Sequence, residues 1–386
     1  MQRSCQGNIR RCSSTSEAYE VFIPNDLPPT PEINLSEISS LLDMANRLIG
    51  ELNGVVDMAA DYSLINYMYV RKEALVSSQI EGTQSTLNDL LKYESNNMAG
   101  VSIEDAAEAS SYVKAINHGL QRIKDGFPLS LRLLREIHKI LLQNSRGNLK
   151  QPGEFRTSQN WIGGTRPGNA KFVPVAPDQL METLGKLELF INQNDNLPIL
   201  VKVALIHVQF ETIHPFLDGN GRLGRLLITL FLCDKKILTT PLLYLSLFFK
   251  KNREMYYEKL NVVRKNGDWE NWINFFLEGI IETARDSKLT IINVQKLFSD
   301  NVKKLDLLKR AKDSALRVFQ CFQKKPILSI AEIMVETNLT KPTIKKSLDN
   351  LTKLGIINND SIRKWGQMYT YTGYVNLLNP ESTNPL

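Results

Sequence analysis

The chain has 386 residues, of which 42% are hydrophobic and 23% charged, and its formal net charge is +6. This composition is typical of a folded protein with two or three domains, and the mild positive charge permits a nucleic-acid partner without requiring one. No apolar run is long enough to span a bilayer, and four scattered cysteines argue against a disulfide framework or a zinc site, so we predict free thiols and a cytoplasmic protein.

The N-terminal third is predicted to be helical after a disordered tail. Residues 1–17 carry Arg and Ser with few apolar side chains, which favours a disordered tail over a transit peptide. Ser102 with Asp105 forms a capping-box pattern, and Ser130 is a second helix-opening residue. Together with apolar residues at helical spacing, these signals predict four helices, at 35–52, 62–79, 102–123 and 130–146.

The segment 153–177 interrupts this helical pattern. It is rich in Gly and Pro, with short apolar runs between them, and we predict two extended runs around a turn, that is, a β-hairpin or flap. Helices resume at Asp178 and continue, with short breaks, to about residue 307.

From about residue 313 the pattern changes to that of a winged helix. Ser329 is placed to cap a second helix, Pro342 lies where a first-turn proline is tolerated, and Gly355 follows the end of a third helix. Two strands are predicted after these helices, at 356–357 and 368–371, on either side of 360–366.

The most informative stretch is the loop sequence HPFLDGNGRLGR, which lies between a periodic helix and an apolar helix. Gly219 and Gly221 on either side of Asn220 can adopt positive φ and turn successive N–H groups toward one point, forming an anion-binding nest. The positive end of the following helix adds to this nest. Arg222 and Arg225 share one face of that helix and can clamp phosphate oxygens.

Two further side chains of the loop complete the chemistry of a phosphate site. Asp218 is a hard oxygen ligand, placed to hold Mg²⁺ on the phosphates. A neutral imidazole at His214 can take a proton from an incoming hydroxyl. The loop therefore suits a bound triphosphate beside a general base.

This loop meets every fixed position of the pattern HxFx(D/E)GNGRxxR, and the chain therefore resembles the Fic family. The resemblance implies a mainly α fold, a Fic-type helical bundle with a β-hairpin flap, followed here by a C-terminal winged-helix domain. It implies transfer of AMP from ATP to a Tyr, Thr or Ser hydroxyl of a protein, with release of pyrophosphate. The implied roles are general base for His214, Mg²⁺ ligand for Asp218, and binding of the ATP triphosphate for Gly219, Asn220, Gly221, Arg222 and Arg225.

Two other segments resemble parts of the same family. The family's flap pairs with the main chain of the target beside the modified residue, and the matching residues here are Gly163, Gly164, Lys171, Phe172 and Val173. Ser77-x-x-x-Glu81-Gly82 matches the family's inhibitory-helix pattern, in which the Glu pairs with the second arginine, here Arg225, and blocks productive ATP binding. The alternative for Glu81 is an ordinary solvated helix glutamate.

Three aromatic or imidazole side chains allow a structural interpretation beside a functional one. His207 lies on the same helical face as His214 and is predicted to be a packed or hydrogen-bonded structural histidine. Tyr256 and Tyr257 either line an adenine pocket or belong to the core, and the sequence leaves both alternatives open.

The winged-helix region carries much of the positive charge. Residues 313–378 hold nine Lys or Arg against five Asp or Glu. The basic residues at the usual phosphate-contacting places are Lys341, Lys345 and Lys346 on the recognition helix and Arg363 and Lys364 in the wing. DNA binding is one hypothesis, and a protein-contact or dimerisation module is the other.

We therefore expect five segments: a disordered tail (1–17), an N-terminal helical region with the inhibitory helix (18–115), a Fic catalytic core (116–290), a linker helix (291–312) and a winged-helix domain (313–386). The expected ligands are ATP, Mg²⁺ and a protein with a hydroxyl side chain. Self-modification, DNA binding and homodimerisation stay open. Two alternative functions also stay open: removal of AMP by the same site, and a DNA-binding regulator whose Fic core senses nucleotide.

Overall fold

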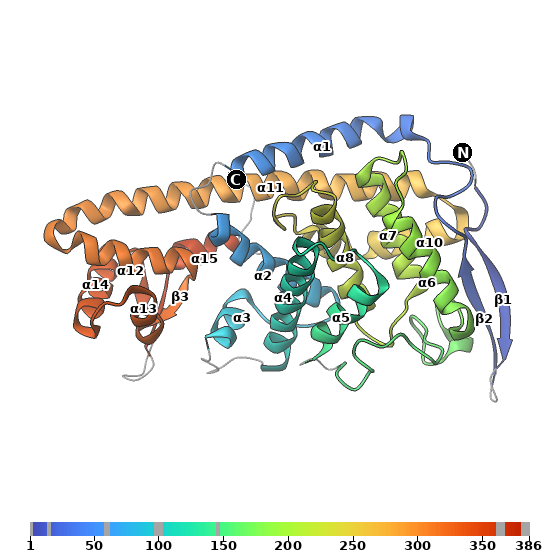
Figure 1. Ribbon diagram of the computed structural model, residues 1–386, viewed down its shortest axis with the longest axis horizontal. Helices are drawn as coiled ribbons and strands as arrows, with labels where there is room; N and C mark the ends of the chain where they lie inside the picture. The colour runs from blue at the N-terminus through green and yellow to red at the C-terminus, as the bar shows by residue number, and fades with distance from the viewer. Residues whose placement is uncertain are drawn as a thin grey trace.

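A computed structural model describes residues 3–13, 17–57, 62–95, 103–143, 147–359 and 367–379. The fold is mainly α, as predicted, and its longest element is α11 (Trp269–Leu305), which extends along most of the molecule. Helix α1 (Leu35–Asp57) packs beside α11 (Figure 1). A C-terminal module lies at one end of this frame and an N-terminal β-hairpin at the other, so the two flank the central helices.

The central helices and the hairpin have the following bounds: β1 Gly7–Ser13, β2 Ala18–Pro24, α2 Tyr62–Ile80, α3 Leu87–Glu94, α4 Ile103–Lys124, α5 Leu131–Leu142, η1 Pro167–Asn169, α6 Pro177–Asn192, α7 Ile199–Ile213, α8 Asn220–Asp234, α9 Leu245–Lys251 and α10 Arg253–Asn266. Helix α2 matches the predicted second helix closely. The sequence did not predict α3, and α5 ends before the predicted residue 146. Ser102, the predicted cap of α4, lies outside the described residues.

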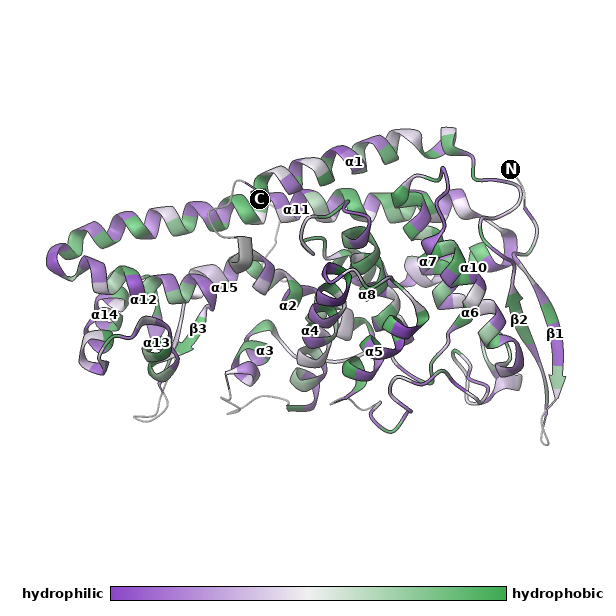
Figure 2. Ribbon diagram, in the orientation of Figure 1, coloured by the Kyte–Doolittle hydropathy of each residue, from purple (hydrophilic) through white to green (hydrophobic). Residues whose placement is uncertain are grey.

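Helices α7 and α8 form the centre of the core. From Leu200 to Ile213 every residue of α7 is buried, and α8 is buried over most of its length. Both helices are largely hydrophobic in Figure 2. Because α7 and α8 pack against each other, the loop between them is held at both ends by the core.

The predicted disordered tail is wrong for Gly7–Ser13, which form β1. This strand pairs antiparallel with β2 in continuous register, from Gly7 opposite Pro24 to Ser13 opposite Ala18. The Arg10 guanidinium also binds the Asp178 carboxylate at the start of α6, with distances of 2.7 and 2.8 Å. Order here depends on partners distant in sequence, which the composition of residues 1–17 does not reveal.

The flap is more irregular than the predicted two-stranded hairpin. Its two limbs are joined by one isolated β-bridge, between Ile162 and Phe172. Gly163 and Gly164 adopt φ of 68° and 75°, which only glycine reaches readily. The Asn169 side chain then accepts the N–H groups of the turn, so side-chain bonds replace a regular ladder.

The C-terminal module is a winged helix, as predicted, with bounds η2 Asp306–Ala311, α12 Lys312–Lys324, β3 Ile327–Ser329, α13 Ile330–Thr337, α14 Lys341–Lys353, β4 Asn358–Asn359, β5 Met368–Thr370 and α15 Thr372–Leu378. Ser329 caps α13 through a complete capping box, and Gly355 follows α14 with φ of 66°. Strand β5 lies between β3 and β4. The strand predicted at 356–357 instead occupies Asn358–Asn359, and β3 and α15 were not predicted.

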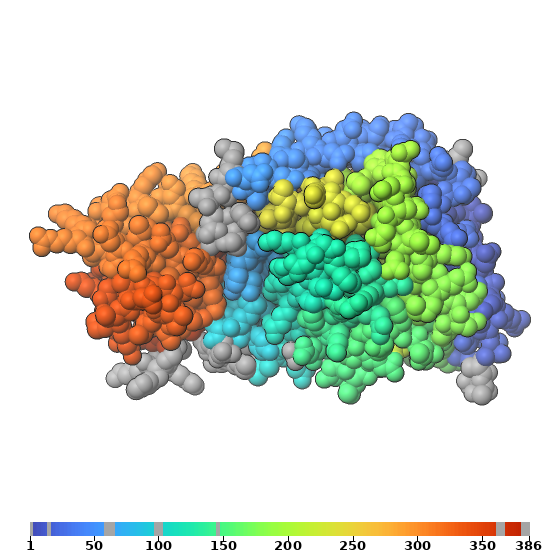
Figure 3. Space-filling view, viewed as in Figure 1, coloured from blue at the N-terminus to red at the C-terminus, as the bar shows by residue number. Residues whose placement is uncertain are grey.

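The winged helix is a separate lobe that contacts the central helices (Figure 3). Helices α12 and α15 both pack against α2, the helix that carries Ser77. Their side chains join one continuous hydrophobic core with those of α2. The predicted linker over 291–312 is the end of α11 followed by η2.

Candidate active site

The loop between α7 and α8 is shaped by its own side chains. His214 ends α7 in the left-handed conformation, with φ of 50°, and Gly219 precedes α8 with φ of 76°. The Asn220 side chain accepts the Phe216 N–H at 2.9 Å and donates to the Phe216 carbonyl at 2.8 Å. Asn220 therefore closes the loop, and its backbone rather than its amide is available to a ligand.

Two residues from the base of the flap hold the other side of this loop. The buried Arg156 donates from Nε to the His214 carbonyl at 2.9 Å, and its backbone N–H donates to the Pro215 carbonyl at 3.0 Å. Asn160 donates to the carbonyls of His214 at 3.1 Å and Phe216 at 2.8 Å. Burial lowers the pKa of Arg156 to about 10, so its guanidinium remains charged at neutral pH.

His138 of α5 supports the loop from below. Its ring stacks on Phe216 with centroids 3.7 Å apart. Its Nδ1 accepts the Gly153 N–H at 2.8 Å, and its Nε2 lies 2.9 Å from the Asp218 carbonyl. Burial lowers the pKa of His138 to about 4, so the ring is neutral and Nε2–H donates to Asp218.

The His138→Ala variant should lower the free energy of unfolding by about 2–4 kcal/mol, because it removes a buried stacked ring and two hydrogen bonds. Urea denaturation of both proteins measures this loss. The matched control is His118→Ala, since His118 lies on the neighbouring α4 with a partly exposed partner, Glu136. Equal losses in the two variants would show that His138 has no special role in holding the loop.

His214 is half-buried at the lip of the loop, with its Nδ1 buried. Burial, and then the positive charges of Arg264 and Arg156, lower the pKa of His214 to about 4. The imidazole is therefore neutral at pH 7 and can accept a proton, which is the state a general base requires.

Arg222 lies buried beside Asp218. Its Nη1 is 2.5 Å from Glu108 Oε1 of α4, and its Nη2 is 3.6 Å from Asp218 Oδ1. Within the described residues, its Nε has no hydrogen-bond partner. A buried guanidinium with an unused donor next to a 42% exposed carboxylate is suited to bind an anion together with a metal ion.

Arg225 binds the end of α2. Its Nε donates to Ser77 Oγ at 2.9 Å, and its Nη2 donates to the Ser77 carbonyl at 3.0 Å and to Glu81 Oε1 at 2.7 Å. A Cβ added at Gly221 would overlap Glu81 Oε1, so this carboxylate lies directly over the N-terminal turn of α8. Burial raises the pKa of Glu81, but the charge and hydrogen bond of Arg225 outweigh it and lower the net pKa. Glu81 is therefore an anion at the position predicted for phosphate.

The two tyrosines that could line an adenine pocket or belong to the core, Tyr256 and Tyr257, differ in burial. Tyr256 is 1% exposed and its hydroxyl lies 2.8 Å from His207 Nε2, so it belongs to the core and offers no surface to a nucleotide. His207 is fully buried, with Nδ1 3.2 Å from the Gly224 carbonyl, which confirms the structural interpretation. Tyr257 is 38% exposed and stays a candidate for the adenine side of the site.

The residues that were predicted to dock a target on the flap differ in their exposure to solvent. Gly163, Gly164 and Lys171 are exposed, and Phe172 is half-buried. Val173 is buried, and its carbonyl accepts the Phe22 N–H of β2 at 2.9 Å. The chain's own hairpin therefore already pairs with the flap at Val173, where pairing with a target was predicted.

The sequence analysis missed four side chains that hold the motif in place: Glu108, His138, Arg156 and Asn160. None belongs to a contiguous pattern, and each reaches the loop from another element. It also missed Glu211, whose pKa burial raises to about 7. Glu211 lies on the side of α7 that is expected to be buried. A charged residue within that apolar stretch was the one sequence signal that could have indicated a buried carboxyl group there.

Two features are absent from the part of the chain that the structure describes. No group of three or more His, Cys, Asp or Glu there is arranged to hold a metal ion. Among those residues there is also no helix of the length and apolarity that a membrane span needs.

Three family models match different parts of the chain. Residues 39–121 match the Fic/DOC family N-terminal model, and residues 128–232 match the Fic/DOC family model. Residues 313–358 match a model described as winged helix-turn-helix DNA-binding. The matched segments follow the same order as the helical region, core and winged helix of the structure.

Curated relatives are similar over about half to two thirds of the chain. The protein adenylyltransferase fic-1 of Caenorhabditis elegans is 28% identical over 184 residues, which cover 46% of this chain and 32% of that protein. The protein adenylyltransferase Fic of Drosophila melanogaster is 26% identical over 253 residues, which cover 64% and 46%. The chain thus spans less than half the length of these relatives.

Solved structures share the fold. A Fic family protein from Desulfovibrio desulfuricans G20 superposes with a TM-score of 0.58 at 21% identity, covering 89% of this chain and 98% of that one. A Fic domain-containing signaling protein from Bacteroides thetaiotaomicron gives 0.51 at 19% identity, covering 64% and 95%. At these identities the similarity concerns the fold alone.

Proposed function

Since this chain carries a Fic/DOC domain, preceded by the family's N-terminal region and followed by a winged helix-turn-helix, we propose that it is a protein adenylyltransferase that is autoinhibited by Glu81. The observation that carries the proposal is the convergence of His214, Arg222 and Arg225 on the N-terminus of α8. This combines a neutral base with two cations and a helix dipole in one site. The names of the curated relatives agree with adenylyl transfer.

The residues of the loop fit ATP. The backbone amides at the start of α8 and the unused Nε of Arg222 supply donors for phosphate oxygens. Tyr257 is exposed enough to contact the base. In this proposal Arg225 binds the terminal phosphate after Glu81 has left it.

Asp218 fits Mg²⁺, because a magnesium site needs only one or two carboxylates when phosphates and waters supply the other oxygens. Asp218 Oδ1 already accepts the Gly219 N–H at 2.6 Å, which fixes the carboxylate beside the nest. Bound there, the ion would neutralise phosphate charge and assist departure of pyrophosphate.

In the proposed reaction His214 takes the proton of a Tyr, Thr or Ser hydroxyl as its oxygen attacks the α-phosphorus. The bond from that phosphorus to the bridging oxygen breaks, and pyrophosphate leaves. Arg156 and Asn160 hold the His214 carbonyl and thereby set the position of the ring. Most of the catalysis would come from positioning and charge stabilisation.

Incubation with ATP labelled on the α-phosphate, and separately on the γ-phosphate, tests the reaction class. Protein that retains label only from the α position supports AMP transfer. Label only from the γ position would indicate kinase chemistry and reject the proposal.

We also propose DNA binding by the winged helix, because Lys341, Lys345 and Lys346 are exposed on α14. Arg363 and Lys364 lie outside the described residues. The Lys345→Glu/Lys346→Glu variant of the full chain should lose most of its affinity for duplex DNA, with a steep salt dependence in the unmodified protein. Fluorescence anisotropy measures this, and the control with equal charge change is Lys296→Glu/Lys304→Glu on α11. Undetectable binding at low salt would leave the protein-contact hypothesis.

A further inference from the structure

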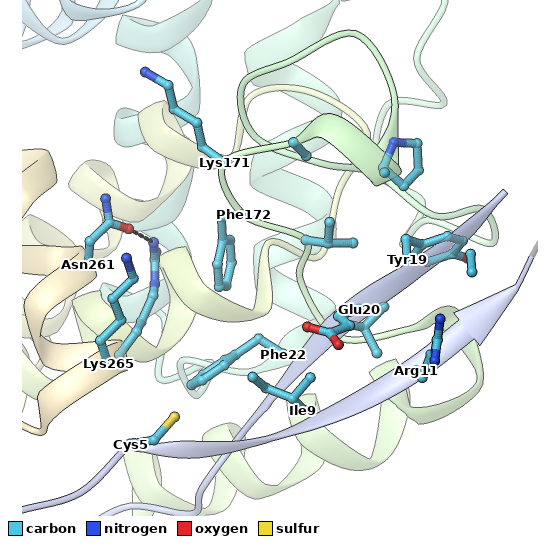
Figure 4. Close-up of a pocket in the computed structure, with 17 residues that line it drawn as sticks. Cys5, Ile9, Arg11, Tyr19, Glu20, Phe22, Lys171, Phe172, Asn261 and Lys265 are labelled. Atoms are coloured by element: carbon cyan, nitrogen blue, oxygen red, sulfur yellow. Dashed lines mark hydrogen bonds between the residues drawn. The ribbon is translucent and has the colours of Figure 1, made fainter.

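A cavity of about 750 Å³ lies between the N-terminal hairpin, the flap and α10. Figure 4 shows the side chains around it, which come from three elements distant in sequence. Those that matter here are Ile9, Arg11 and Phe22 of the hairpin, Lys171 and Phe172 of the flap, and Lys265 of α10. We call this cavity the hairpin groove.

The hairpin presents one face to the groove because strand residues alternate between faces. Ile9 is opposite Phe22 and Arg11 is opposite Glu20 in the β1–β2 register, so these four side chains share a face. Arg10 lies on the other face of β1, where it binds Asp178. The hairpin is thereby attached to α6 through one face and leaves the other to the groove.

The charge of the hairpin groove is strongly positive. Among the described residues, its lining contains four that are basic, Arg11, Lys171, Arg264 and Lys265, and one that is acidic, Glu20. Arg11, Lys171 and Lys265 are exposed and come from three different elements. The cations are thus spread around the groove, which suits several separated negative charges better than one compact anion.

The groove also contains an apolar subsite. The Phe22 and Phe172 rings lie 5.8 Å apart in a tilted arrangement, and the Arg264 guanidinium lies 4.2 Å from the Phe172 centroid. Ile9 is 62% exposed beside them. An apolar side chain of a partner could be buried here between the charged contacts.

Arg264 connects the groove to the catalytic loop. Its Nε donates to Thr212 Oγ1 at 3.0 Å, and its Nη2 donates to the Glu211 carbonyl at 3.2 Å, just before His214. Its Nη1 donates to Asn261 Oδ1 at 3.0 Å. Each nitrogen of the Arg264 guanidinium therefore already makes one hydrogen bond within the protein, and its positive charge contributes to the lining of the groove.

We propose that the hairpin groove binds an acidic, extended segment of the protein that receives AMP, next to the residue that is modified. This inference rests on the proposed AMP transfer and names the substrate class for it. The occupant follows from the spread cations, from the apolar subsite, and from the flap residues that line the groove. The buried Arg264, which also lines the groove, binds Thr212 and the Glu211 carbonyl just before His214. A chain segment with Asp or Glu around an apolar residue satisfies all three.

The test uses the full chain with Glu81→Gly, a peptide library in which random residues flank a central Tyr, Thr or Ser, and ATP labelled on the α-phosphate. Modified peptides should be enriched in Asp and Glu on one side of the modified residue. The Arg11→Glu/Lys265→Glu variant should lose this enrichment and modify the acidic peptides at least about tenfold more slowly. Neither side chain belongs to the catalytic loop or the flap. Lys296→Glu/Lys304→Glu, with the same charge change on exposed positions of α11, should behave like the parent.

A binding measurement separates failure of this proposal from failure of the proposed reaction. Fluorescein-labelled peptides with either six Asp/Glu or six Lys around one Phe and one Tyr report groove binding by anisotropy without any transfer. Preference for the acidic peptide, lost in Arg11→Glu/Lys265→Glu, supports the groove even if no AMP is transferred. Equal binding in the parent and this variant overturns the proposal, as does transfer without acidic preference. Tighter, groove-dependent binding of an oligothymidylate of the same charge would assign the groove to nucleic acid instead.

Discussion

The His214→Ala variant should transfer AMP about 10²–10⁴-fold more slowly, while its folding and its ATP binding remain close to those of the parent. The reason is that His214 stands half-buried at the lip of the loop, outside the apolar core of α7 and α8, whereas its neutral ring can accept the hydroxyl proton. The comparison is best made in the Glu81→Gly background, where activity is expected to be high. Single-turnover transfer from labelled ATP measures the rate.

The pH dependence gives an independent check on this role. Burial and two nearby arginines lower the pKa of His214 to about 4, so the ring loses its proton well below neutral pH. Activity attributed to this base should therefore stay level as the pH falls from 8 to about 5 and decline near 4. A decline centred near the ordinary histidine pKa of about 6.5 would mean that the free site does not have the environment seen here.

Circular dichroism and a nucleotide-binding measurement control for misfolding. Arg225→Ala is the useful contrast, because it should lose productive ATP binding rather than the chemical step. Turnover like that of the parent in a folded His214→Ala variant would remove His214 from the mechanism.

The Glu81→Gly variant should transfer AMP, including to itself, at least about tenfold faster than the unmodified protein, which corresponds to roughly 1.4 kcal/mol. Glu81 and the terminal phosphate of ATP compete for one guanidinium, and the Glu81 carboxylate also covers Gly221 at the start of α8. Arg225 keeps its bonds to Ser77 when Glu81 is removed, so its guanidinium remains in place. The gain should appear in nucleotide binding rather than in fold stability.

A matched control removes a similar ion pair elsewhere on α2. Arg71 binds Glu94 at 2.7 Å near the end of α3, away from the loop. Glu94→Gly should therefore leave transfer unchanged, although it breaks a comparable bond. The double variant Glu81→Gly/Arg225→Ala should be inactive, because the terminal phosphate then has no clamp.

Two other outcomes of the Glu81 experiment are informative. Loss of AMP removal from a modified target in Glu81→Gly would make Glu81 a catalytic group of the reverse reaction. If Glu81→Gly changes neither AMP transfer nor AMP removal, the Glu81–Arg225 contact does not regulate the site. The inhibitory-helix assignment would then be wrong.

The sequence by itself determined the features that depend on neighbours along the chain. Helical periodicity located α1 and α2, capping and turn residues located α13 and α14, and one contiguous motif identified the loop from His214 to Arg225. Each of these signals is local, because a helix or a turn is specified by side chains within a few residues of one another. The Ser77 and Glu81 pattern is local in the same sense, and in the structure both residues contact Arg225.

Only the tertiary structure decided what depends on residues far apart in sequence. Residues Gly7–Ser13 form a strand because β2 and Asp178 provide partners, and the Val173 carbonyl accepts the Phe22 N–H of β2. Burial assigned Tyr256 to the core and lowered the pKa of His214. The hairpin groove brings residues 11 and 265 to the lining of one cavity, and no spacing in the sequence records that arrangement. Long-range packing sets burial and thereby the local electrostatics, so these properties cannot be obtained from sequence patterns alone.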